Sequence, residues 1–185
     1  FRRAEARFDL PWTLLAAVAY HESSWDPSAV SPTGVRGLMM LTSSTARSMG
    51  VNRLDPGQSI EGAARYLSEL RDALPAEIPE PARTWLALAA YNVGPGHLED
   101  ARKLALRLHL DPNRWSGVKE AFPKLSQRAY ARFSSHGYVQ GSQPVRYVER
   151  VRDLHAILDL ASAEQSGHVQ SDYFLADGER RVAYP

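Results

Sequence analysis

Residues 11–40 read PWTLLAAVAYHESSWDPSAVSPTGVRGLMM, an apolar segment that runs directly into a loop rich in Ser, Pro and Gly. Four residues recur at the spacing of one helix face: Leu15, Val18, Ala19 and Glu22. Pro11 suits a first helical turn, so we expect a helix over residues 11–23. The turn-forming residues that follow predict a long loop over residues 26–42, and loops of that length are often functional.

Working outward, the same apolar periodicity predicts six more helices, over residues 43–49, 59–74, 82–91, 98–108, 115–125 and 144–161. Thr42 and Ser59 are the expected N-caps of the first two. No convincing alternating strand appears, so the predicted fold class is all-α, in one domain over residues 1–161. We expect residues 126–143 to form an irregular loop beside a cleft, and residues 162–185 to be a tail or a surface strap.

Composition excludes several function classes. Lys and Arg number 22 against 21 Asp and Glu, so there is no strong basic field for nucleic acid. Cysteine is absent, which removes disulfides, thiolate metal sites and a Cys nucleophile. No apolar run approaches the roughly 20 residues that cross a bilayer. Because the chain starts at Phe1 without a signal peptide, we expect it to be part of a longer protein.

Glu22 is an acid that extends the apolar face of its own helix. Removing a carboxyl group from water favours its neutral form and raises its pKa, so such a residue can donate a proton near neutral pH. The alternative is a Glu at a helix end that turns out to solvent. Position alone favours the alternative, and the surrounding motif favours the proton donor.

Three blocks resemble the soluble lytic transglycosylase family over residues 10–160. The first has Glu-Ser at 22–23, a Ser nine residues after the Glu, and Gly-Leu-Met at 37–39. The second is AYNVG at 90–94, which matches the family's Ala-Tyr-Asn-x-Gly motif. The third and weaker block is Tyr147 with Val148 and Val151, similar to the Tyr-Val-x-x-Val that opens a late helix.

Two positions depart from the family's pattern. Met40 stands where most relatives carry Gln, which is typical of a membrane-bound branch of the family and puts one polar substrate contact in doubt. Ser59 stands where many relatives place an Asn before the Ile of the corresponding helix, and both residues are good N-caps.

The resemblance implies a lysozyme-like, goose-lysozyme-type helical domain with an active-site cleft. It implies cleavage of peptidoglycan between N-acetylmuramic acid and N-acetylglucosamine without water, which leaves a 1,6-anhydromuramoyl end and makes the enzyme formally a lyase. Glu22 would act first as acid and then as base. Ordinary glycosidases need two carboxylates about 5 to 9.5 Å apart. The candidates for a second carboxylate are Asp26, Glu61, Glu69 and Asp72. None of them belongs to a motif.

The same resemblance implies the substrate-binding residues, which are Ser31, Met39, Met40, Tyr91, Asn92 and Tyr147. Each has a plainer alternative. Ser31 closes a turn before Pro32, Asn92 caps a helix, Tyr147 is a tyrosine satisfied in the core, and Met39 is a core methionine. Trp25, Trp85 and Trp115 stack on sugars only if they are not core residues, which is their default.

The six histidines show no metal-site spacing, so no metal and no cofactor are predicted, and His21 is expected on the surface. A hydrolase of similar fold and an inactive peptidoglycan-binding module are the rival functions. By resemblance, the expected location is the periplasm, with an outer-membrane tether and a solute-binding-like regulatory domain in an upstream part. We expect a monomer that binds glycan strands.

Overall fold

The computed structural model describes residues 1–165, and this part of the chain is helical. Its elements are α1 (Arg2–Phe8), α2 (Trp12–Ser23), α3 (Ser43–Ser48), α4 (Pro56–Asp72), α5 (Ala82–Val93), α6 (Pro95–Arg107), α7 (Trp115–Leu125), the 3-10 helix η1 (Ala131–Phe133) and α8 (Ser142–Gln165). Within residues 1–165 the only β pairing is an isolated bridge between Val30 and Arg36. The all-α fold class is therefore confirmed.

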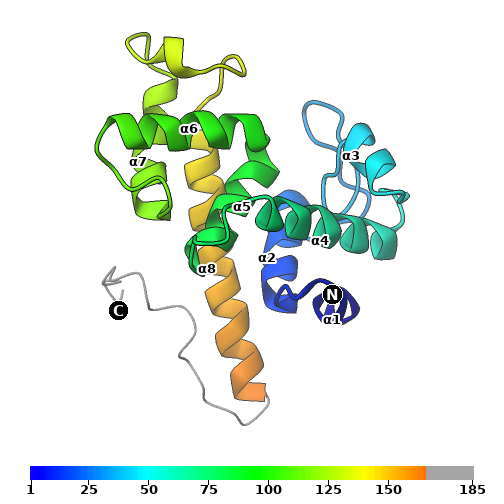
Figure 1. Ribbon diagram of the computed structural model, residues 1–185. Helices are drawn as coiled ribbons and strands as arrows, with labels where there is room; N and C mark the ends of the chain where they lie inside the picture. Colours follow the sequence, from blue (N-terminus) through cyan, green and yellow to red (C-terminus); the bar gives the residue numbers. More distant parts are fainter. Residues whose placement is uncertain (166–185) are drawn as a thin grey trace, which may run out of the picture.

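Helix α5 lies at the centre of the domain. All six residues from Trp85 to Ala90 are buried, because neighbouring helices cover every side of α5. It packs against α4, α6, α7 and α8. The long helix α8 packs against both α2 and α5 (Figure 1).

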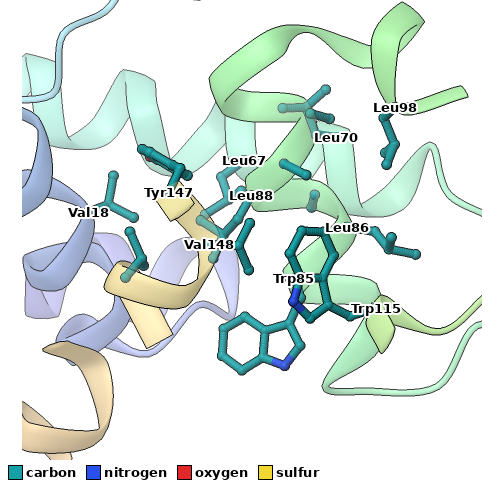
Figure 2. Close-up of a cluster of buried hydrophobic side chains, with 14 of the residues drawn as sticks. Val18, Leu67, Leu70, Trp85, Leu86, Leu88, Leu98, Trp115, Tyr147 and Val148 are labelled. Atoms are coloured by element: carbon teal, nitrogen blue, oxygen red, sulfur yellow. The ribbon is translucent and has the colours of Figure 1, made fainter. Parts of the chain in front are cut away.

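The core is continuous from α2 to α7. Figure 2 shows it from Val18 of α2, past Leu88 of α5 and Val148 of α8, to Trp115 of α7. Trp85 and Trp115 are both core residues, as expected by default. Helix α2 is buried almost all round between Thr13 and Ala19, so its C-terminal end is the part available to a site.

Several helix starts differ from the sequence prediction. Helix α1 was not predicted, because its one buried residue is Ala4 and it shows no apolar stripe. Helix α4 begins at Pro56 with Asp55 as N-cap, which accepts from the Gln58 amide at 2.7 Å. The predicted cap Ser59 is therefore wrong, and Ser59 is instead fully buried in the first turn.

Helix α6 begins at Pro95, three residues before the predicted start. The Gly-Pro-Gly run that ends α5 also opens α6, because Pro suits a first helical turn and Gly94 takes a φ of 90°. Helix α7 has its predicted bounds, and Thr42 caps α3 as expected. Helix α8 is longer than predicted at both ends. The predicted tail lies almost wholly outside the described residues, so the domain division stays a prediction.

Candidate active site

The C-terminal end of α2 is held in an unusual backbone conformation. Ser24 and Trp25 both have left-handed φ values, 52° and 63°, which non-glycine residues adopt rarely and at some cost. The Ser24 amide donates to the Tyr20 carbonyl at 2.8 Å, and the Trp25 indole Nε1 donates to the Ala16 carbonyl at 2.9 Å. These two bonds fix the point at which the chain leaves the helix, directly after Glu22.

Ser23 ties this helix end to the Gly-Leu-Met turn. Its hydroxyl lies 3.0 Å from the Ala19 carbonyl and 2.8 Å from the Leu38 carbonyl, and it is buried. Gly37 is the first residue of this turn and has a φ of 98°. Its α-carbon lies so close to the Arg53 carbonyl that a side chain would not fit. The helix end and the turn therefore form one rigid unit beside Glu22.

Glu22 is half-buried, and burial raises the pKa of its carboxyl group to about 7. The interaction with the Tyr147 hydroxyl opposes this shift in pKa and is smaller. No charged carboxylate from residues 1–165 is among the causes of the shift. Burial therefore favours the protonated form of Glu22 near neutral pH, as the sequence argument for a proton donor required.

Two tyrosines from other helices face Glu22. Burial raises the pKa of Tyr91 and of Tyr147 well above the usual value, and the charge of Glu22 raises the pKa of both further. Tyr91 comes from α5 and Tyr147 from α8, and Figure 2 shows Tyr147 beside Val18 of α2. The structure therefore brings together Glu22, Tyr91 and Tyr147, which were predicted from three separate motifs.

The polar side-chain atoms of the predicted residues on α5 and α8 are of two kinds. The Tyr91 hydroxyl donates to the Met39 carbonyl at 2.9 Å, so its proton is committed to the turn. The Tyr147 hydroxyl and the Asn92 Oδ1 atom are buried. Asn92 Oδ1 has no hydrogen-bond partner in residues 1–165, and the Tyr147 hydroxyl faces Glu22 without a well-formed hydrogen bond to any group there. Asn92 lies within α5, whose C-cap is Gly94, so the helix-cap alternative for Asn92 is wrong.

The remaining predicted site residues lie on the loop and turn after α2. Met39 is fully buried in the core, and it faces the site through its main-chain carbonyl rather than through its side chain. Met40 is half-buried, with a left-handed φ of 46°. The Ser31 hydroxyl accepts from the Val35 amide at 3.0 Å, so it closes the turn at the tip of the loop.

Sequence reasoning missed two features at this end of α2. His21 was expected on the surface, but its ring packs edge-on against Tyr147 with 4.8 Å between centroids, and burial followed by the charge of Arg150 lowers its pKa. Trp25 was expected in the core by default, yet 47% of it is exposed. The sequence could not predict the contact of His21 with Tyr147, because that contact depends on α8 covering α2. It could not predict the exposure of Trp25, because that exposure depends on the left-handed turn.

A metal-centred site finds no support in the described part of the chain, which contains no group of three His, Asp or Glu side chains arranged to hold an ion. Among the described helices, none is both long and apolar enough to cross a bilayer. A half-buried Glu at a helix end, whose pKa burial raises to about 7 and which two tyrosines face, lies here in an all-helical domain of the lysozyme-like class.

Comparison with known proteins identifies the family within that class. The sequence model of the Transglycosylase SLT domain matches residues 1–109, more than half of the chain, and the chain belongs to this family. It is 54% identical to membrane-bound lytic murein transglycosylase F 1 of Alkalilimnicola ehrlichii over 159 residues. These aligned residues make up 85% of this chain and 32% of that protein.

Two further relatives carry the name membrane-bound lytic murein transglycosylase F. The one from Stutzerimonas stutzeri is 52% identical over 166 residues, or 89% of this chain and 34% of the relative. The one from Saccharophagus degradans is 52% identical over 183 residues, or 98% of this chain and 36% of the relative. The chain thus spans about a third of the length of these relatives. The resemblance to a membrane-bound branch of the family is confirmed.

Proposed function

We propose that this domain is a peptidoglycan lytic transglycosylase with Glu22 as its one catalytic carboxyl group. The observation that carries the proposal is the burial of Glu22 at the end of α2, facing Tyr91 and Tyr147, which raises the pKa of its carboxyl group to about 7 without help from a second carboxylate. A group that must donate a proton and then accept one works best when its pKa lies near the working pH. The names of the relatives, lytic murein transglycosylases, support the same substrate.

In the first step protonated Glu22 donates its proton to the oxygen that joins N-acetylmuramic acid to N-acetylglucosamine. The bond to the muramic acid C1 breaks, and the acetamido oxygen of the same sugar stabilises the positive charge at C1. Ionised Glu22 then accepts the proton of the muramic acid C6 hydroxyl as its oxygen bonds to C1. The product is a 1,6-anhydro ring, and Glu22 ends protonated as it began.

The site offers two polar groups for orienting the sugar. Within residues 1–165, Asn92 Oδ1 has no hydrogen-bond partner, and the Tyr147 hydroxyl interacts with Glu22 without a well-formed hydrogen bond. A buried polar atom without a good partner is costly. We assign to the Tyr147 hydroxyl a hydrogen bond that it donates to the acetamido oxygen. Asn92 Oδ1 would accept a hydrogen bond from a substrate N–H or hydroxyl group. Ser31 remains a proposed contact at the rim of the loop, and Met39 serves the site through its carbonyl.

Two other functions are tested by the same experiment. A hydrolase would leave a reducing end, and it would need a base that activates water. An inactive binding module would leave glycan intact, and it would have no use for a carboxyl group whose pKa is raised by burial.

The test is mass spectrometry of purified peptidoglycan after digestion by this protein and by its Glu22→Gln variant, with glycan binding measured for both. Anhydromuropeptides from the parent alone support the proposal. Reducing-end products would instead indicate a hydrolase, and intact glycan with retained binding would indicate a binding module.

We place the whole protein in the periplasm, tethered to the outer membrane by a part that this sequence does not include. The word membrane-bound in the relatives' names and their threefold greater length support this placement. We also propose that the additional length contains a regulatory, solute-binding-like domain and that the protein is a monomer. Size-exclusion chromatography of the full-length protein would test the monomeric state.

A further inference from the structure

A surface hollow lies between the last turn of α2 and the middle of α8. Figure 1 shows these two helices side by side. Its volume is about 360 Å³. The residues that line it are Tyr20, His21, Ser24, Arg150, Asp153 and Leu154. We call it the α2–α8 groove, and none of the proposed catalytic or sugar-binding residues lines it.

The groove is nevertheless connected to the catalytic end of α2. His21 forms part of its wall, and the His21 ring also packs edge-on against Tyr147, the residue that interacts with Glu22. Ser24 lies two residues after Glu22 on the same helix end. A flexible substituent of a sugar bound at Glu22 therefore has a short route into the groove.

The groove contains an available cation. Arg150 is exposed and forms no ion pair with any carboxylate in residues 1–165, although it lies close enough to His21 to lower the pKa of that ring. Burial also lowers the pKa of His21, which favours the neutral ring, and Arg150 is the Arg side chain that lines this wall. The guanidinium group of Arg binds carboxylates in a fixed, often bidentate geometry.

One wall of the groove continues into exposed aromatic surface. Tyr20 and Trp25 are 42% and 47% exposed, and their rings pack edge to face with 4.9 Å between centroids. The indole of Trp25 is fixed by its hydrogen bond to the Ala16 carbonyl, so its position costs little further order on binding. A fixed aromatic pair beside an unpaired Arg suits a ligand with both apolar and carboxylate groups.

We propose that the α2–α8 groove binds the short peptide that muramic acid carries, with a peptide carboxylate on Arg150 and its apolar groups against Tyr20 and Trp25. This inference rests on the proposed function, since it concerns the same substrate. Four extended residues span at most about 14 Å, and the groove begins at His21 and Ser24, on either side of Glu22 in the sequence. A neutral sugar would gain little from Arg150, so the charge favours the peptide over a second glycan.

The experiment compares glycan strands with intact peptides and the same strands stripped by an amidase. For Arg150→Gln we expect kcat/KM on peptide-bearing strands to fall about fivefold, as loss of a partly exposed charged contact would cause. We expect no change on stripped strands. Arg146→Gln is the matched control, because Arg146 is exposed on α8 one turn earlier and does not line the groove.

An equal effect of Arg150→Gln on both substrates, or none on either, would overturn the groove proposal. A binding measurement keeps this result separate from catalysis. Titration of a soluble muramoyl tripeptide into the Glu22→Gln variant should give an affinity about fivefold weaker when Arg150→Gln is added, and unchanged affinity again overturns the groove. If the parent cleaves neither strand yet binding depends on Arg150, the lyase proposal fails and the groove proposal stands.

Discussion

The Tyr91 hydroxyl donates a 2.9 Å hydrogen bond to the main-chain carbonyl of Met39 and so joins the end of α5 to the turn that follows α2. Two other helices hold the same short segment. The Ser59 hydroxyl of α4 accepts from the Met39 amide at 3.3 Å, and the Ser23 hydroxyl of α2 lies 2.8 Å from the Leu38 carbonyl. The backbone beside Glu22 is therefore positioned by side chains of three helices.

Replacing Tyr91 by Phe should cost stability and activity together. The Met39 carbonyl would lose its donor, so we expect the free energy of unfolding to fall by about 1–2 kcal/mol. The turn would loosen, and kcat should fall more than KM rises. Urea denaturation and steady-state kinetics measure both. Tyr66→Phe is the control, since Tyr66 packs beside Tyr91 but its hydroxyl bonds to nothing in residues 1–165, and an equal effect of both variants would contradict this role.

The pH dependence of catalysis should follow the carboxyl group of Glu22. The proposed mechanism needs this group protonated in the free enzyme, and burial raises its pKa to about 7. We therefore expect kcat/KM to be level below pH 7 and to fall about tenfold per pH unit above it. The measurement is a pH profile of anhydromuropeptide release under kcat/KM conditions. A fall centred near pH 4.5, the ordinary value for Glu, would mean that Glu22 is not desolvated in the active protein.

The same pKa predicts a stability effect with a definite sign. The folded chain keeps the Glu22 proton up to about pH 7, whereas the unfolded chain loses it near pH 4.5, so stability falls as pH rises between these values. Glu22→Gln mimics the protonated group and escapes this loss. We expect the variant to match the parent below pH 4.5 and to exceed it by about 3 kcal/mol above pH 7.

Urea denaturation of the parent and Glu22→Gln at pH 4 and pH 8 measures this difference. Glu120→Gln on α7 is the control, because Glu120 is exposed and its variant should differ from the parent by less than about 0.5 kcal/mol at both values. A Glu22→Gln difference that does not grow with pH would contradict the linkage.

Sequence patterns predicted the helices that bury a stripe and missed those that do not. Helix α7 buries Val118, Phe122 and Leu125 at helical spacing, and its bounds were predicted without error. Helix α1 buries Ala4 alone and carries no such signal. The start of α6 was missed because a Gly-Pro-Gly run ends one helix and opens the next.

The site divides in a similar way. The position of Glu22 on an apolar face is a local feature, but position alone favoured a solvent-exposed Glu, and the surrounding motif was needed to favour the proton donor. Tyr91 and Tyr147 were found through motifs, since periodicity cannot tell that residues on α5 and α8 face a helix far earlier in the chain. The exposure of Trp25 and the contact of His21 with Tyr147 depend on the left-handed turn and on helix packing, and no local pattern reports either.

Two glycines of the loop and turn after α2 make a matched pair for the last prediction. Gly34 and Gly37 both have positive φ values, 82° and 98°, so Ala is strained at either position. A Cβ at Gly34 would meet nothing within 4 Å, whereas a Cβ at Gly37 would lie 2.2 Å from the Arg53 carbonyl oxygen. Because that oxygen belongs to the backbone, the contact can be relieved only by moving the turn.

We therefore expect Gly34→Ala to cost about 1 kcal/mol of unfolding free energy, the ordinary penalty of a left-handed Ala. Gly37→Ala should cost about 3 kcal/mol or more, because the displaced backbone adds to that penalty. Its activity should also fall, since the turn that binds Tyr91 and Ser23 would shift away from Glu22. Urea denaturation and anhydromuropeptide release test both effects. Equal losses for the two variants would show that the close approach of Gly37 to Arg53 does not hold the turn in place.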